Sequence, residues 1–328
     1  MQRRQLLALG IVAAAAGIGG IASRQAFAAD LDRAKARLGR GSVVFDSRFG
    51  RMEYAVQGSG PPCVMIHGTG GGFDQGLEFA ARLIAAGRQI IAPSRFGYLR
   101  SAFPADASSE AQADAIVDLL DHLGIARVPV IGGSAGALSA MQFAIRHPDR
   151  CSALVALVPA AYTPDRAPPP PPNALAAGII TYGLQSDYLF WCGLKLAEDA
   201  MIGALLATDP ALVHAAAPHE QARVRAILHD ILPVSLRVQG LLNDGKLSGA
   251  PKPMSLETIT VPTFVASVED DRFGTAAPAR FIAASVPGAE LVIYPTGGHV
   301  WVGHDADLMA RVDGFLRTIQ RVLQLDGA

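Results

Sequence analysis

The stretch Val130-Ile131-Gly132-Gly133-Ser134-Ala135-Gly136-Ala137 decides the fold. The apolar run over residues 128–131 predicts a buried strand, and apolar residues at helical spacing begin at Leu138. The Gly-x-Ser-x-Gly between them is typical of a strand that turns at once into a helix, with Ser134 at the strained pivot. We expect the Ser134 hydroxyl to project from the sheet beside a helix N-terminus, where a nucleophile could attack a carbonyl carbon. A glycine-rich turn with Ser134 as the helix N-cap is the alternative interpretation.

Length and composition indicate a globular α/β protein. The chain has 328 residues, half of them apolar, which is enough for one large α/β domain with an insertion or for two small domains. The net charge of −1 offers no basic surface, so we expect no nucleic-acid partner. Cys63, Cys151 and Cys192 lack the CxxC spacing and predict no disulfide framework. Cys63 and Cys151 are expected to be buried core thiols.

The first 28 residues predict a targeting segment. Two arginines near the start precede an apolar run over residues 6–22, and Ala26-Phe27-Ala28 has the small-x-small pattern of a cleavage site. Residues 2–7 also resemble a twin-arginine export signal, so we expect an exported protein, periplasmic or extracellular. An uncleaved N-terminal helix that tethers the protein to a membrane is the alternative.

Strands and helices alternate along most of the chain, which predicts a mostly parallel twisted sheet with helices on both faces. The expected parallel strands lie at residues 63–66, 89–92, 128–131, 153–158, 262–266 and 290–294, after an antiparallel pair at 42–45 and 51–56. The alternation stops at Pro159, and a helix-rich segment follows it. The predicted domains are therefore a core of residues 30–159 and 256–328 and a helical cap insertion over 160–255.

A serine needs a base to remove its proton, so a histidine and an orienting carboxylate are expected after Ser134, in the order acid and then histidine. The strand at 262–266 leads to Glu269-Asp270-Asp271, and the strand at 290–294 leads to Gly297-Gly298-His299. Both segments lie at the carboxyl ends of parallel strands, the edge where active sites of open α/β sheets form. We expect this edge to bring the serine, an acid and the histidine together.

The histidine at this edge is expected to act first as general base and then as general acid. The glycines before His299 favour it over its neighbour His304. Asp271 is the expected acid, which would hold the imidazole in the required tautomer, and Asp270 is the alternative. The remaining carboxylates of this turn are expected to be solvated.

The developing oxyanion of an acyl transfer needs hydrogen-bond donors. The backbone N–H of Ala135 is one candidate, and the glycine-rich loop 67–72 offers the other. Thr69 N–H is the first choice in this loop and Gly70 N–H the second, while His67 is expected to be structural. A phosphate loop is excluded because its lysine is missing. No histidine–carboxylate spacing indicates a metal site, and we expect no cofactor.

These motifs together resemble the α/β-hydrolase superfamily over about residues 43–325. The resemblance implies a Ser-His-Asp hydrolase under a mobile helical cap. It also supports Asp271, because the second aspartate of an Asp-Asp pair is often the triad acid in this family. The segment Ala92–Tyr98 departs from the family pattern, because the aspartate usual in that loop is replaced. Serine at the elbow argues against a haloalkane-dehalogenase or epoxide-hydrolase mechanism.

The expected function is hydrolysis of a small, mostly apolar ester or related acyl compound, with a small molecule as the partner. Carbon–carbon bond hydrolysis and cofactor-free perhydrolysis use the same triad and stay open. A non-catalytic binding module on this fold is the alternative of another class. The cap aromatics Tyr188, Phe190 and Trp191 are expected either to line the substrate pocket or to form the core of the cap.

Overall fold

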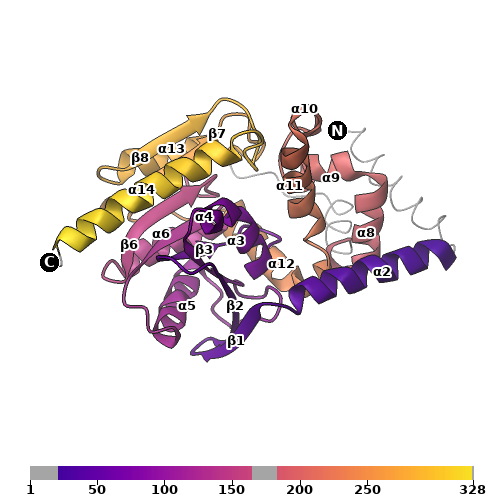
Figure 1. Ribbon diagram of the computed structural model, residues 1–328, viewed down its shortest axis with the longest axis horizontal. Helices are drawn as coiled ribbons and strands as arrows, with labels where there is room; N and C mark the ends of the chain where they lie inside the picture. The colour runs from indigo at the N-terminus through magenta and orange to yellow at the C-terminus, as the bar shows by residue number, and fades with distance from the viewer. Residues whose placement is uncertain (1–20, 165–182, 327–328) are drawn as a thin grey trace.

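Eight strands form one sheet in a computed structural model that describes residues 21–164 and 183–326 (Figure 1). The order across the sheet is β1-β2-β4-β3-β5-β6-β7-β8. The strands are β1 (Ser42–Ser47), β2 (Gly50–Gln57), β3 (Pro62–Ile66), β4 (Gln89–Pro93), β5 (Val128–Gly133), β6 (Cys151–Leu157), β7 (Thr263–Val268) and β8 (Glu290–Tyr294). The pairs β1–β2 and β2–β4 are antiparallel, and all other neighbours are parallel. The prediction of a mostly parallel α/β sheet is therefore confirmed.

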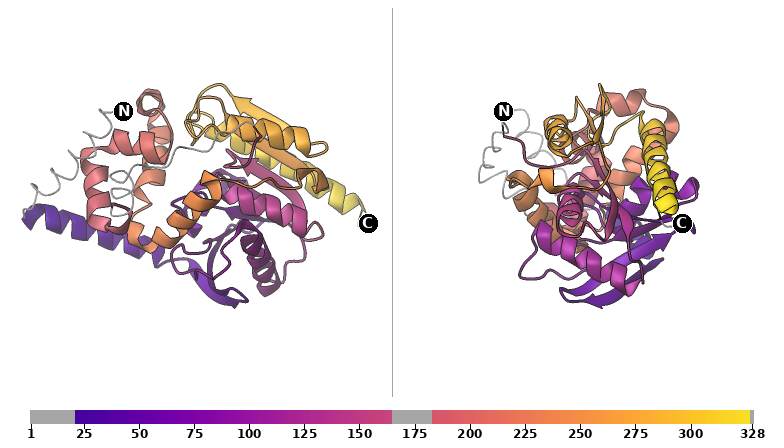
Figure 2. Two further views of the ribbon diagram at one scale, coloured as in Figure 1. Left: turned by 180° about the vertical axis from the view of Figure 1, so that it is seen from behind. Right: turned by 90° about the vertical axis from the view of Figure 1, so that its left-hand side faces the viewer.

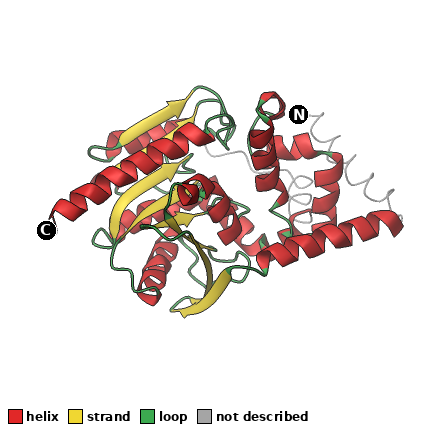
Figure 3. Cartoon of the chain, viewed as in Figure 1, coloured by secondary structure: helices red, strands yellow, loops and turns green. Residues whose placement is uncertain are grey.

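Helices cover both faces of this sheet (Figure 3). The core helices are α3 (Phe73–Phe79), α4 (Ala81–Ala85), α5 (Ser109–His122), α6 (Gly136–Arg146), α13 (Ala276–Ser285) and α14 (Asp305–Asp326). Successive residues of a strand point to opposite faces. In β3, Cys63 and Met65 pack with α3, α4 and α14, whereas Val64 and Ile66 pack with α5, α6 and α13. The continuous apolar runs in the sequence are strands buried on both faces.

A group of helices is inserted between β6 and β7. It comprises α8 (Asp187–Leu196), α9 (Glu198–Leu205), α10 (Pro210–Ala215), α11 (Pro218–His229) and α12 (Val238–Gly249), with the short 3₁₀ helix η1 (Val234–Leu236) before α12. A second 3₁₀ helix, η2 (Leu256–Thr258), leads back to the core. Figures 1 and 2 show α8 to α11 standing to one side of the sheet. We call α8 to α12 the inserted helices.

The N-terminal helix α2 (Ile21–Leu38) runs along the inserted helices (Figure 1). This helix contains the predicted cleavage site at Ala28. The twin-arginine pattern at residues 2–7 lies outside the described residues. Within the described ranges, no helix combines the length and the apolar character needed to cross a membrane.

Candidate active site

The strand-to-helix turn after β5 holds Ser134 in a strained backbone conformation. Its φ angle is 52°. This value lies in the left-handed region, which is energetically unfavourable for a residue with a Cβ atom. The neighbours must be small for this turn to form. A Cβ atom at Gly132 would lie 2.6 Å from the carbonyl oxygen of Gly136, and one at Gly136 would lie 2.4 Å from the carbonyl oxygen of His67. The Gly-x-Ser-x-Gly spacing is therefore a steric requirement of this turn.

The structure brings together the three side chains that the sequence analysis singled out. His299 Nε2 lies 2.9 Å from the Oγ atom of Ser134, and His299 Nδ1 lies 2.8 Å from Oδ2 of Asp271. Because an ionised carboxylate only accepts hydrogen bonds, Nδ1 carries the imidazole proton. Nε2 is then free to accept the serine proton. This is the geometry that a general base requires.

Asp271 is buried and accepts several hydrogen bonds. The hydroxyl of Thr275 donates to Oδ2, the same oxygen that faces His299, and the N–H of Phe273 donates to Oδ1 over 2.9 Å. Burial by itself raises the pKa of Asp271. The charge of His299 and these hydrogen bonds outweigh burial, so the pKa lies below its ordinary value. Thr275 is a supporting residue that the sequence analysis missed, since a threonine four residues after an acid has no distinctive pattern.

The alternative acid, Asp270, has a different position. Its carboxylate accepts the backbone N–H of Gly298 at 2.8 Å and that of Gly297 at 3.2 Å. Asp270 therefore holds the turn that presents His299, and the expectation that it is a solvated carboxylate is wrong. The sequence analysis did not predict this role of Asp270, because its backbone partners lie 27 and 28 residues further along the chain.

Two other predictions at this edge of the sheet can be compared with the structure. Glu269 is exposed and pairs with Arg280, as expected for a solvated turn carboxylate. The ring of His304 stacks on Tyr294 with 4.2 Å between ring centroids, so this histidine belongs to a separate contact.

The glycine-rich loop after β3 lies against the serine. A Cβ atom at Gly68 would lie 3.2 Å from the Cβ atom of Ser134. The N–H of Gly68 donates to Gln75 over 2.9 Å, and the N–H of Gly70 donates to the Tyr98 hydroxyl over 3.2 Å. The second-choice donor, Gly70, is therefore already engaged.

The two first-choice donors, unlike Gly70 N–H, are not already hydrogen-bonded within the described ranges. Thr69 N–H and Ala135 N–H have no hydrogen-bond acceptor among the residues that the structure describes. Thr69 is exposed at the tip of its loop, and Ala135 lies at the start of α6. Neither amide is therefore engaged within the described part of the chain, as an oxyanion donor requires.

His67 is a structural residue of the glycine-rich loop, as the sequence predicted. Its Nδ1 donates to the carbonyl of Gly68 at 2.7 Å, and its Nε2 accepts the backbone N–H of Arg95 at 2.9 Å. Complete burial, and then the charge of Arg95, hold the pKa of His67 well below its ordinary value. The imidazole is neutral and fully engaged, so it has no capacity left to act as a base.

The cap aromatics pack away from the serine. Trp191 donates its indole N–H to Asp30 of α2 at 2.7 Å, and Phe27 of α2 packs edge-on against both Tyr188 and Trp191. Phe190 is buried in the core of the inserted helices. These contacts favour the cap-core interpretation of the three aromatics.

A cavity of about 420 Å³ lies beside these aromatics, between α2 and the inserted helices. None of Ser134, Asp271 and His299 lines this cavity. Its lining is rich in charged residues and comprises Asp30, Arg33, Ala34, Arg37, Trp191, Leu194, Lys195, His229, Asp230 and Leu232. Phe273 borders the described site. Its ring and that of His299 lie nearly perpendicular, with 4.8 Å between the ring centroids, and 44% of Phe273 is exposed.

Comparisons with known proteins agree with this architecture. The family model for the alpha/beta hydrolase fold matches residues 61–202. The putative carbamate hydrolase RutD of Klebsiella pneumoniae (strain 342) is 28% identical over 253 residues, covering 75% of this chain and 87% of RutD. The uncharacterised hydrolase YcgS of Bacillus subtilis (strain 168) is 38% identical over 113 residues, covering 34% of this chain and 39% of YcgS.

A solved structure shares this fold over a larger part of the chain. The alpha/beta hydrolase fold protein from Nakamurella multipartita superposes with a TM-score of 0.67 at 24% identity, covering 84% of this chain and 99% of that one. The strand order and the strained serine turn are the internal signs of the same fold. The sequence similarities and the shared sheet show that the chain has the alpha/beta hydrolase fold.

Proposed function

We propose that this protein is a serine hydrolase that cleaves a small, mostly apolar ester or related acyl compound. The observation that carries the proposal is the hydrogen-bonded chain from Ser134 through His299 to Asp271, with distances of 2.9 and 2.8 Å. Few structural roles require a strained serine, a correctly oriented imidazole and a buried carboxylate in one line.

In the proposed mechanism, Ser134 Oγ attacks the substrate carbonyl carbon while its proton moves to His299 Nε2. Asp271 stabilises the imidazolium that forms. The carbonyl oxygen becomes an oxyanion and accepts hydrogen bonds from Thr69 N–H and Ala135 N–H. One such donor contributes about 10²- to 10³-fold in rate. His299 then protonates the leaving group, and an acyl-enzyme on Ser134 remains for hydrolysis by water.

An apolar substrate is supported by the surroundings of the glycine-rich loop. A Cβ atom at Gly70 would lie 3.4 Å from Ile231 and 3.8 Å from Leu241, both apolar residues of the inserted segment. On the other side, the exposed ring of Phe273 borders His299. Aliphatic and aromatic walls favour an acyl or alcohol group without charge.

A carbamate is a second candidate substrate, because the similarity to RutD extends over 75% of this chain. Carbamate cleavage uses the same nucleophile and the same oxyanion donors as ester cleavage. Carbon–carbon bond hydrolysis of a diketone and cofactor-free perhydrolysis would use the same residues as well. The leaving group and the attacking species distinguish these reactions, so a substrate panel separates them.

The test is a panel of p-nitrophenyl esters, carbamates, lactones, amides and diketones with the purified full-length chain. We expect measurable ester hydrolysis that Ser134→Ala abolishes. Ser139→Ala is the matched control and should retain activity, because within the described ranges its hydroxyl bonds only the Gly136 carbonyl on the same helix. Activity that survives in Ser134→Ala would contradict the proposal. Failure of a fluorophosphonate to label Ser134, together with no turnover, would favour a binding module.

We also propose that the protein is exported through its twin-arginine-like N-terminus, to the periplasm or the exterior. A membrane tether through an uncleaved N-terminus is the alternative. The packing of Phe27 against Tyr188 and Trp191 favours the uncleaved form, since cleavage after Ala28 would remove this ring. N-terminal sequencing of the protein from fractionated cells distinguishes a chain that begins at Ala29 from an intact one.

A further inference from the structure

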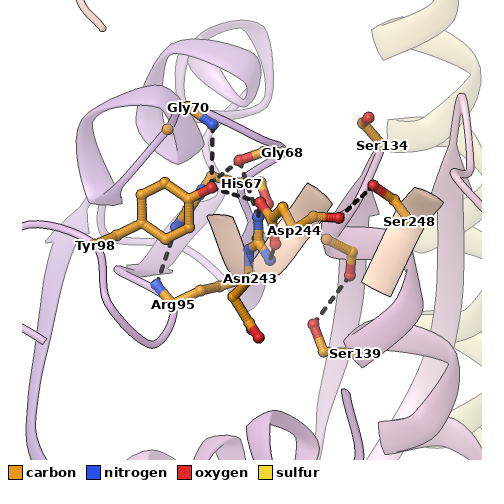
Figure 4. A network of polar contacts seen from close by, with 12 residues as sticks. His67, Gly68, Gly70, Arg95, Tyr98, Ser134, Ser139, Asn243, Asp244 and Ser248 are labelled. Carbon is orange, nitrogen blue, oxygen red and sulfur yellow. Dashed lines mark hydrogen bonds and ion pairs between the residues drawn. The ribbon is translucent and has the colours of Figure 1, made fainter. Parts of the chain in front are cut away.

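A buried carboxylate of the inserted helices reaches the glycine-rich loop of the core. Asp244 lies on α12, and its side chain is 1% exposed. Its Oδ1 and Oδ2 atoms each lie 2.6 Å from a terminal nitrogen of Arg95, whose side chain is 4% exposed. This is a bidentate ion pair, the geometry that fixes the plane of a guanidinium group. Figure 4 shows the pair within the polar network that it forms with Gly68 and Tyr98.

The two partners of Asp244 continue to the loop backbone. Arg95 donates from Nε to the carbonyl of His67 and from Nη2 to the carbonyl of Gly68, both over 3.0 Å. Tyr98 donates its hydroxyl hydrogen to Asp244 and accepts the N–H of Gly70 over 3.2 Å (Figure 4). One carboxylate thereby fixes the backbone on both sides of Thr69.

This arrangement determines which amide of the loop stays available. Gly68 N–H points to Gln75 and Gly70 N–H points to the Tyr98 hydroxyl, so both are engaged inside the protein. The intervening Thr69 N–H has no acceptor within the described part of the chain. The Thr69 N–H lies in the same peptide plane as the Gly68 carbonyl, so a rotation of that plane would change the direction of the N–H bond. Fixed neighbours therefore fix the oxyanion donor.

The helix that carries Asp244 is itself attached to the core. The N–H of Gly240 donates to the carbonyl of Gly97 over 3.0 Å, and a Cβ atom at Gly240 would lie 2.2 Å from the Tyr98 ring. The N–H of Leu99 donates to the carbonyl of Leu236 over 2.7 Å. These backbone contacts, one from α12 and one from η1 just before it, attach this end of α12 to the core.

We propose that Asp244 is a positioning residue for the oxyanion-binding loop, acting through Arg95 and Tyr98 on the direction of Thr69 N–H. The inference rests on the proposed serine-hydrolase function, because it assigns Thr69 N–H to the oxyanion. It makes α12, one of the inserted helices, a structural part of the proposed catalytic site. A buried ion pair is weak evidence for stability, whereas its directional hydrogen bonds specify one geometry.

The experiment compares three variants in the full-length chain. Asp244→Asn keeps the shape of the side chain but removes its charge from Arg95. Tyr98→Phe keeps the ring but removes the hydroxyl between Asp244 and Gly70. Ser248→Ala is the control on the same helix, because among the described residues its hydroxyl bonds only the main-chain carbonyl of Asp244 (Figure 4).

We expect kcat for a p-nitrophenyl ester to fall about 10- to 100-fold in Asp244→Asn and Tyr98→Phe, with KM changed less than about threefold. Affinity for a boronic acid that forms a tetrahedral adduct on Ser134 should fall in parallel with kcat. Ser248→Ala should match the parent. A loss that appears in KM alone, or an equal loss in Ser248→Ala, would overturn the proposal.

Hydrogen–deuterium exchange supplies a readout that does not depend on turnover. Amides of residues 67–72 should exchange faster in Asp244→Asn and Tyr98→Phe than in the parent, and at the parent rate in Ser248→Ala. Unchanged exchange in both test variants would overturn the positioning role even if the enzyme is active. An inactive parent with the expected exchange pattern would instead count against the hydrolase proposal. If Asp244→Asn fails to fold, Tyr98→Phe decides the question.

Discussion

The Nε2 atom of His299 lies 2.9 Å from the Oγ atom of Ser134, across 165 residues of chain. Two separate turns create this contact, one at the carboxyl end of β5 and one after β8. Asp270 supports the second turn by accepting the N–H groups of Gly297 and Gly298. The two neighbouring aspartates therefore have different roles, one on the imidazole and one on the backbone that carries it.

The two aspartates should respond differently to the same isosteric change. In Asp271→Asn the group that faces Nδ1 can no longer stabilise an imidazolium, so we expect kcat to fall about 10⁴-fold. In Asp270→Asn an amide oxygen can still accept one backbone N–H, so we expect a loss of at most about tenfold. Steady-state kinetics with a p-nitrophenyl ester measure both. Equal losses in the two variants would contradict the assignment.

Asp74 should give the protein a pH-dependent stability at the acid end. Burial by itself raises the pKa of Asp74, but the guanidinium groups of Arg237 and Arg37 lower it to about 2. The ordinary value is about 3.9, so the stabilisation is present above about pH 4 and is lost as the pH falls through 2. We expect this carboxylate to contribute about 2–3 kcal/mol to the free energy of unfolding at neutral pH.

Urea unfolding of the parent and of Asp74→Asn, at several pH values between 2 and 7, measures this contribution. The difference between the two proteins should be largest near neutral pH and should shrink below about pH 4. Asp199→Asn is the control, because that carboxylate is exposed and pairs only with His214. A difference that stays constant down to pH 2 would show that the charge of Asp74 has no part in it.

The N-terminal helix α2 should contribute to the stability of the whole enzyme through Arg37. This side chain pairs with Asp74 and donates to the carbonyls of Asp230 at 3.0 Å and Leu232 at 3.1 Å. Arg37 is partly exposed, so Arg37→Ala should lower the free energy of unfolding by about 1–2 kcal/mol.

Arg33 on the same helix provides the comparison for Arg37. Its side chain is 73% exposed and pairs only with Asp30, three residues away. Arg33→Ala should therefore change the free energy of unfolding by less than about 0.5 kcal/mol. Thermal or urea unfolding of both variants checks this, and a larger loss in Arg33→Ala than in Arg37→Ala would contradict the docking of α2.

Phe273 should influence the choice of acyl chain, because its exposed ring packs against His299 with 4.8 Å between the ring centroids. In Phe273→Ala we expect kcat/KM for a hexanoate ester to fall about tenfold, which corresponds to the loss of one aromatic contact. The acetate ester is too short to gain much from this ring and should lose less. Equal losses for the two esters would mean that the ring acts on His299 and not on the substrate.

Local patterns in the sequence determined the elements of this fold and the place of the candidate nucleophile. The apolar runs predicted the parallel strands because a strand buried on both faces has no polar positions. The spacing around Ser134 predicted the strained turn because only small residues fit between β5 and α6. The order of acid and histidine at the strand ends followed from the same topology.

Tertiary structure alone decided which groups meet across long distances in the chain. Asp244 and Arg95 are 149 residues apart, and Asp74 and Arg237 are 163 apart, so no local spacing indicates either pair. The different roles of Asp270 and Asp271 likewise depend on where the turn after β8 lies. A periodic pattern reports which side of an element is buried, but the partner of a buried charge is chosen by the packing of elements that are distant in sequence.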